Sequence, residues 1–140
     1  MHPNFYYYPI NISANGNLTC SLLVAGFARR FWQGNETHRG VPGNPGRVAT
    51  LVEEKGVVTF GLALELTGED ALDYLNNREV SLGGYNQHIA MFQPANSKAP
   101  PFPVLVYVAT AGSSYWLGPA PPHEIAEQVR QHDITEDSMK

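Results

Sequence analysis

The sequence predicts an α+β protein, and three observations lead to this prediction. Short runs rich in apolar and β-branched residues predict five strands: Leu22–Ala28, Val48–Val52, Val57–Leu66, Asn86–Phe92 and Val104–Thr110. Two stretches with apolar residues at helical spacing predict helices, one after Asp70 and one that starts at Pro121 or Pro122. The loose alternation in Val57–Leu66 favours a strand that is buried on both faces, or a barrel.

Local signals refine the first half of the chain. Tyr6–Ile12 is a further candidate strand, but Pro9 restricts it to a sheet edge or a loop. Gly26 interrupts the strand Leu22–Ala28 and indicates a close approach of another backbone segment. The residues Glu54–Gly56 predict a turn that separates the second predicted strand from the third.

The loop before Arg47 is rich in glycine and proline. Its glycines and prolines are Gly40, Pro42, Gly43, Pro45 and Gly46. Together these residues predict a tight, stiff connection. The glycine spacing does not indicate a phosphate site, because the Gly-Lys-Ser/Thr ending is missing and the prolines remove backbone donors. Arg47 then opens the strand Val48–Val52.

Composition excludes several classes of function. The 140 residues are enough for one domain, and the net charge of −4 with no basic cluster beyond Arg29-Arg30 argues against nucleic acid. The five histidines lack metal-ligand spacing, and Cys20 is the single cysteine. We therefore expect no metal site and no internal disulfide.

The sequence also predicts a cytoplasmic protein that does not bind membranes. The N-terminus has no basic region of the signal-peptide type, and the apolar run Leu22–Ala28 is too short to cross a bilayer. A lone cysteine fits a reducing compartment. We expect a monomer whose partner is a small-molecule substrate.

The predicted helix after Asp70 carries the candidate chemistry. Thr67 and Asp70 have the spacing of a capping box. One apolar face follows, formed by Ala71, Leu72, Tyr74 and Leu75. Gly83 and Gly84 close the segment with residues that are free to adopt positive φ.

Glu79 falls in the last turn of this helix or just past it. The negative end of the helix dipole and partial burial both favour the neutral carboxyl there, which suits a group that accepts and returns a proton. Successive helical side chains diverge, so we expect Arg78 to face elsewhere. The alternative is a solvated glutamate at a helix end.

Several motifs resemble one family. The catalytic segment of ChaC proteins, the glutathione-specific γ-glutamylcyclotransferases, is similar to Arg78-Glu79 followed by Gly83-Gly84-Tyr85. Upstream, the matching strings are Arg-Arg-Phe-Trp-Gln-Gly at 29–34, His-Arg-Gly at 38–40, Pro-Gly-Arg-Val at 45–48 and Thr-Leu-Val-Glu at 50–53. Downstream, they are Leu-Gly-Pro-Ala-Pro at 117–121 and Ile-Ala-Glu-Gln at 125–128. The resemblance runs from about Val24 to Gln128.

The resemblance implies a fold and an activity. The fold is a small mixed or antiparallel β-barrel with helices outside it. The activity is that of a lyase, in which the α-amine of the γ-glutamyl group of glutathione attacks its own side-chain amide and releases 5-oxoproline and cysteinyl-glycine. Glu79 matches the catalytic glutamate and serves as the acid and base. The resemblance requires no cofactor.

Further site residues follow from the same motifs. Gly83, Gly84 and Tyr85 are predicted to line the substrate site, although Tyr85 alternatively packs in the core with its hydroxyl satisfied. A substrate carboxylate is predicted to bind one of three arginines, namely Arg30, Arg39 or Arg47. The alternative for each arginine is a structural ion pair.

The chain also departs from the family pattern. The family starts with a strand and a Tyr-Gly-Ser-Leu loop that holds the γ-glutamyl group, and residues 1–23 do not match it. Helical sequence that follows the last helix in the family is also missing. We divide the chain into an unmatched segment 1–23, a cyclotransferase-like domain 24–130 and a polar tail 131–140. These departures leave three alternatives open, namely a divergent member of the family, an alternative product or an incomplete chain. The competing hypothesis is an inactive relative that binds γ-glutamyl ligands or a protein.

Overall fold

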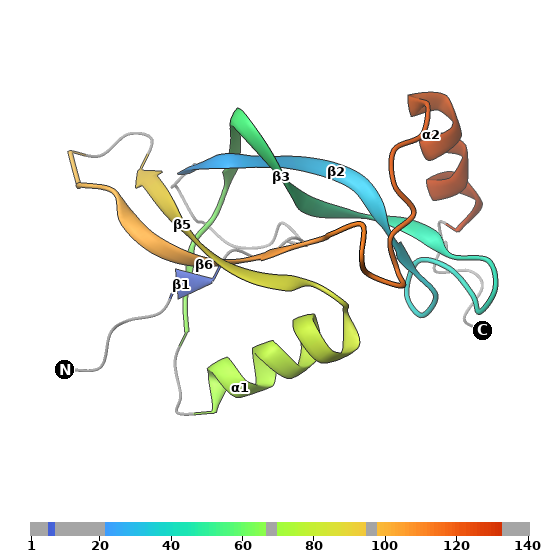
Figure 1. Cartoon of the computed structure of the whole chain (residues 1–140), viewed down its shortest axis with the longest axis horizontal. Helices are drawn as coiled ribbons and strands as arrows, with labels where there is room; N and C mark the ends of the chain where they lie inside the picture. Colours follow the sequence, from blue (N-terminus) through green and yellow to red (C-terminus); the bar gives the residue numbers. More distant parts are fainter. Residues whose placement is uncertain (1–5, 8–21, 67–69, 95–97, 133–140) are drawn as a thin grey trace.

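A computed structural model describes residues 6–7, 22–66, 70–94 and 98–132. The elements follow one another as β1 (Tyr6–Tyr7), β2 (Leu22–Asn35), β3 (Gly46–Gly61), β4 (Leu64–Glu65), α1 (Ala71–Asn76), a π-helical turn η1 (Asn77–Leu82), β5 (Asn86–Pro94), β6 (Phe102–Val108) and α2 (Pro122–Gln131). Figure 1 shows α1 on one side of the strands and α2 beside the far end of β2 and β3. The α+β prediction is confirmed.

The strands form one mixed sheet in the order β3-β2-β5-β6-β1-β4. The antiparallel pair β2–β3 spans Leu22↔Gly61 to Asn35↔Gly46, and β5–β6 runs from Asn86↔Val108 to Phe92↔Phe102. β3 also meets β6 in a parallel pairing at Leu51↔Val108. This pairing is shorter than the continuous ladder of a closed barrel, so the barrel stays a prediction.

The strand β6 organises the core because both of its faces are buried. Val104, Val106 and Val108 face a cluster that also contains Phe27, Leu51, Ala90 and Phe92. Leu105 and Tyr107 point to the other side, where Leu75 of α1 packs against them with Leu66, Leu72 and Tyr85. The alternation of side chains along a strand therefore joins two clusters through one element.

Two details of the predicted strands are wrong. β3 continues through Glu54–Gly56, where a turn was predicted. At this point Gly56 adopts φ +83°, Gly26 of β2 adopts φ +86°, and the register of the two strands shifts. These positive φ values bend the ladder. Nothing lies within 4 Å of a Cβ built on Gly26, so this glycine serves the bend and not a close backbone approach.

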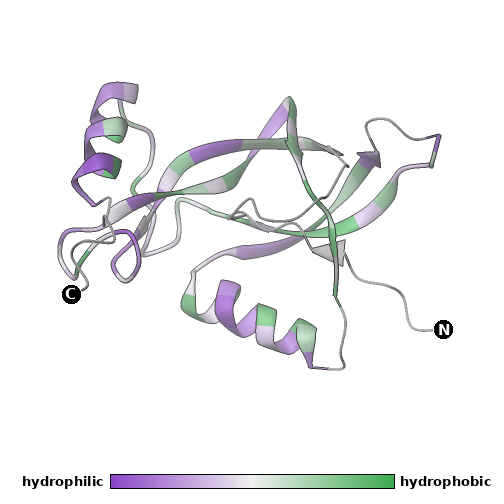
Figure 2. Ribbon diagram, turned by 180° about the vertical axis from the view of Figure 1, so that it is seen from behind, coloured by the Kyte–Doolittle hydropathy of each residue, from purple (hydrophilic) through white to green (hydrophobic). Residues whose placement is uncertain are grey.

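The far half of β3 is not buried on both faces. Val58 and Phe60 are exposed, whereas Thr59 between them is buried and donates to the carbonyl of Phe27 over 2.7 Å. Figure 2 shows this part of the sheet from behind, with apolar residues along its strands. The loose alternation in the sequence therefore reflects an exposed apolar face.

The two helices differ in how far their side chains are buried: α1 buries Leu75, and α2 has no buried residue. In α1, Leu75 is buried but Tyr74 is exposed, so the predicted apolar face lacks one member. Asp70 stands at the N-cap without a side-chain capping bond, and Thr67 lies outside the described residues. α2 starts at Pro122, as predicted, and packs against β3. Figure 2 shows polar and apolar residues alternating along both helices.

Candidate functional site

The predicted base Glu79 lies in η1, directly after α1. Its side chain is 14% exposed, and Tyr85 donates its backbone N–H to the Glu79 carbonyl over 3.0 Å. The segment thus turns back on itself and brings Tyr85 beside Glu79. Turns of the π type are frequent at functional sites.

Arg78 does not face away from Glu79, and this expectation was wrong. Its Nε and Nη2 atoms donate to Oε1 of Glu79 over 2.8 and 2.5 Å. A π turn has more residues per turn than an α-helix, so adjacent side chains diverge less. The guanidinium is half exposed while the carboxylate is mostly covered, which leaves Arg78 as a partially solvated neighbour of the candidate base.

Two tyrosines complete the surroundings of Glu79. Burial raises the pKa of Tyr85 to about 12, the Glu79 carboxylate adds to the rise, and a hydrogen bond with Thr50 opposes it. Burial and Glu79 likewise raise the pKa of Tyr107 to about 12, against an opposing effect of Arg78. The Tyr107 hydroxyl donates to Oδ1 of Asn76 over 2.6 Å. Both phenols are therefore neutral near pH 7 and can act as donors.

The glycines of the predicted site are sterically required. A Cβ on Gly83 would lie 2.7 Å from the Glu79 carbonyl oxygen and 2.8 Å from the Tyr85 ring. A Cβ on Gly84, whose φ is +70°, would lie 2.6 Å from Oγ of Ser113. Only Gly84 uses a positive φ; Gly83 has φ −89°. The turn is thus packed too closely for any side chain.

Gln33 belongs to this site and was missed by the sequence analysis. It is 1% exposed in β2, and its Nε2 donates to the Gly83 carbonyl over 2.9 Å. Gln33 lies in the family-like string Arg-Arg-Phe-Trp-Gln-Gly, but the predicted strand ended at Ala28, whereas β2 continues to Asn35. Tyr107, Asn76 and Thr50 were missed as well, because nothing local in the sequence separates them from core residues.

Arg47, a predicted carboxylate ligand, holds other parts of the fold together. Its Nη1 donates to the carbonyls of Phe31 and Gly118 over 2.8 and 2.7 Å, and its Nε donates to Oε1 of Gln128 over 2.7 Å. Burial lowers the pKa of Arg47, and Glu124 opposes that effect. The guanidinium thereby ties β2, the loop before α2 and α2 to the start of β3.

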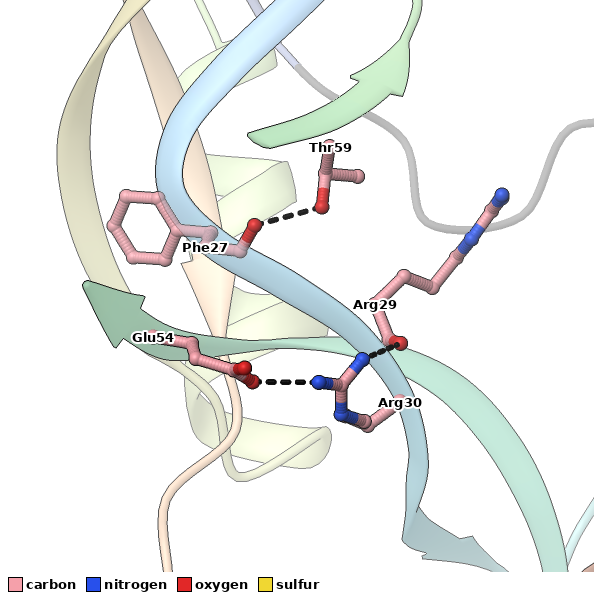
Figure 3. Close-up of polar contacts among 5 residues, drawn as sticks. All are labelled: Phe27, Arg29, Arg30, Glu54 and Thr59. Atoms are coloured by element: carbon pink, nitrogen blue, oxygen red, sulfur yellow. Dashed lines mark hydrogen bonds and ion pairs between the residues drawn. The ribbon is translucent and has the colours of Figure 1, made fainter. Parts of the chain in front are cut away.

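The other two arginines lie outside the Glu79 cluster. Arg30 pairs with Glu54 over 2.6 Å, which is the structural ion pair of the alternative hypothesis; Figure 3 shows this contact and the neighbouring Arg29 side chain turned away from it. Arg39 is exposed in the loop before β3, where its backbone N–H donates to Oδ1 of Asn35 over 2.8 Å. Of the predicted residues, the structure brings together Glu79, Gly83, Gly84 and Tyr85.

The site offers proton transfer and hydrogen bonding. A mostly covered carboxylate, two neutral phenols and a buried amide surround one turn, and this set can exchange protons with a polar ligand. Among the described residues, no three His, Cys, Asp or Glu side chains form a group that could hold a metal ion. Within the same residues, no helix has the length and apolar character needed to cross a bilayer.

Comparison with solved structures defines the class of fold. The chain is similar to a γ-glutamyl cyclotransferase specific to glutathione from yeast, with a TM-score of 0.66 and 20% identity over 97% of this chain and 91% of the yeast chain. The fold is therefore that of this class of protein. A family model described as ChaC-like protein matches residues 13–133, and the chain belongs to the ChaC-like family.

Relatives with assigned activities agree with this assignment. Glutathione-specific γ-glutamylcyclotransferase 1 of Danio rerio is 47% identical over 109 residues, which cover 76% of this chain and 56% of the relative. The Homo sapiens protein of the same name is 46% identical over 110 residues, covering 76% and 50%. The chain thus spans about half the length of these relatives.

Proposed function

We propose that the chain is a glutathione-specific γ-glutamylcyclotransferase. The observation that carries the proposal is the position of Glu79, a carboxylate 14% exposed beside two neutral phenols and a glycine turn. The names of the relatives support the choice of glutathione as substrate. The single cysteine supports a cytoplasmic location.

The proposed reaction is an intramolecular transfer. The α-amine of the γ-glutamyl group attacks the carbonyl carbon of its own side-chain amide, a C–N bond closes the five-membered ring of 5-oxoproline, and the bond to the cysteinyl nitrogen breaks. The α-amine arrives mostly protonated, because its ordinary pKa lies near 8. The nitrogen must therefore lose one proton before it attacks and a second as the ring closes, and the cysteinyl nitrogen gains two protons when it leaves as an ammonium group.

Glu79 performs both proton transfers in this proposal. One carboxylate near both nitrogens accepts each of the two protons in turn from the attacking nitrogen and passes it to the leaving nitrogen, so no external acid is needed. Ring closure is already intramolecular, and the protein therefore contributes mainly a fixed rotamer and exclusion of water. The close packing around Gly83 and Gly84 fixes the turn beside the carboxylate, and Tyr85 is a neutral donor at the same turn.

The three predicted arginines differ in role: two have structural contacts, and one is available to bind a substrate carboxylate. The contacts of Arg30 and Arg47 support structural roles, since their guanidinium groups are directed to Glu54, to backbone carbonyls and to Gln128. Arg39 is exposed and remains our proposed ligand for a distant carboxylate of the substrate.

Product analysis tests the proposed function. Purified chain is incubated with glutathione, and 5-oxoproline, cysteinyl-glycine and free glutamate are quantified together. Equal amounts of 5-oxoproline and cysteinyl-glycine, without glutamate, are the expected result. Release of glutamate would indicate hydrolysis instead, and a folded chain that binds glutathione but forms no product would indicate the inactive, ligand-binding relative.

A further inference from the structure

The side-chain amide of Gln33 has a hydrogen-bond partner at its nitrogen but, among the described residues, none at its oxygen. Its Nε2 donates to the Gly83 carbonyl over 2.9 Å. Its Oε1 is buried, and among the described residues no group donates to it. The orientation of the amide is fixed, since a carbonyl only accepts and Nε2 must therefore face Gly83. An unsatisfied buried acceptor costs free energy, which a ligand donor would recover.

The strand register places Gln33 on the same face as the candidate site. Gln33 pairs with Val48 of β3, and directly paired residues project to the same face of a sheet. Val48 and Thr50 are two residues apart and share that face, whereas Arg47 lies on the other. The bond from Nε2 joins Gln33 to Gly83, and Tyr85, two residues further on, donates its backbone N–H to the Glu79 carbonyl. Gln33 thus belongs to the group around Glu79.

The inference rests on the proposed function and adds a substrate contact to it. We infer that Oε1 of Gln33 accepts a hydrogen bond from the α-ammonium group of the γ-glutamyl ligand. An ammonium carries several N–H donors and can give Glu79 only one of them at a time, so a second acceptor is needed to orient the nitrogen. The bond from Nε2 to Gly83 fixes that acceptor relative to the catalytic turn.

A purely structural role makes a different prediction. If Gln33 only anchors Gly83, its removal disturbs the turn and weakens every ligand of the site to a similar extent. If Oε1 binds the ammonium, removal weakens a ligand that has the α-ammonium and spares one that lacks it. Glutaryl-cysteinylglycine is glutathione without that group, and it cannot cyclise.

Calorimetric titration separates the two roles. Both ligands are titrated into Glu79→Gln, which prevents turnover, and into Glu79→Gln combined with Gln33→Met. We expect the affinity for glutathione to fall about ten- to a hundredfold, the range of a hydrogen bond to a charged group. The affinity for glutaryl-cysteinylglycine should change less than about threefold. Gln93→Met is the matched control, since Gln93 is also a strand glutamine that donates to a carbonyl.

A second variant covers the case in which Gln33→Met does not fold. Gln33→Glu keeps an acceptor but loses the donor to Gly83, so the preference for glutathione over the glutaryl analogue should persist. Equal weakening of both ligands, or of neither, would overturn the inference while 5-oxoproline release by the wild-type chain stands. Absence of that release would overturn the proposed function, and absence of any glutathione binding would overturn both.

Discussion

Replacing Arg47 by methionine tests whether this arginine supports the fold or binds substrate. The side chain is 9% exposed and donates to two backbone carbonyls, those of Phe31 and Gly118, and to the side chain of Gln128. Methionine keeps much of the aliphatic length but has no N–H. The variant therefore removes the donors while the volume changes little.

The expected loss of stability follows from these contacts. A buried carbonyl that loses its donor costs about 1–3 kcal/mol. The bond to Gly118 is buried, whereas those to Phe31 and Gln128 are partly buried, so their loss is partly offset by water. Removing a desolvated guanidinium also returns some free energy. We expect a net loss of about 2–4 kcal/mol, a large share of the stability of an ordinary domain.

Urea denaturation measures this loss. With a slope of about 1–3 kcal/mol per molar urea, the midpoint should fall by about 1–2 M. Arg130→Met is the control, because Arg130 is exposed and pairs with Glu127 within α2, and its midpoint should not move measurably. An Arg47→Met protein with an unchanged midpoint but a raised KM for glutathione would refute the structural role and restore Arg47 as a carboxylate ligand.

Two further predictions concern the glycine turn and the buried phenols. Gly84→Ala should lower stability by about 1–2 kcal/mol more than Gly56→Ala, because both positions have positive φ but only Gly84 lacks room for a Cβ; equal losses in urea denaturation would contradict this. Stability should fall as pH rises from 10 towards 12, because Tyr85 and Tyr107 ionise in the unfolded chain first. Each contributes up to about 1.4 kcal/mol per pH unit. Tyr85→Phe should halve the slope, and an unchanged slope in urea midpoints between about pH 10 and about pH 12 would contradict the assignment.

The sequence predicted the elements better than their ends. Strand-forming runs and the proline start of α2 are local signals, and the structure has strands at each predicted run. The ends were missed where a turn signal lies inside a strand: Gly56 resembles a turn residue, but β3 bends there without ending, between the pairs Phe27↔Glu53 and Ala25↔Val58. Exposure was also hidden, since Val58 and Phe60 have the composition of core residues.

The site was predicted as far as its motif extends along the chain. Glu79, Gly83, Gly84 and Tyr85 are close in sequence and also close in space. Gln33 comes from a strand 50 residues away, and only the folded sheet reveals its bond to Gly83. The predicted direction of the Arg78 side chain was wrong because no local pattern indicated a π turn in place of an α-helical one.

The rate of 5-oxoproline release before and after Glu79→Gln tests the central claim most directly. Glutamine keeps the shape and an acceptor for Arg78 but cannot carry the proton. We expect release by the wild-type chain, loss of release in Glu79→Gln with an unchanged urea midpoint, and full release in the control Glu53→Gln, whose carboxylate is exposed. A Glu79→Gln protein that releases 5-oxoproline at the wild-type rate would contradict it.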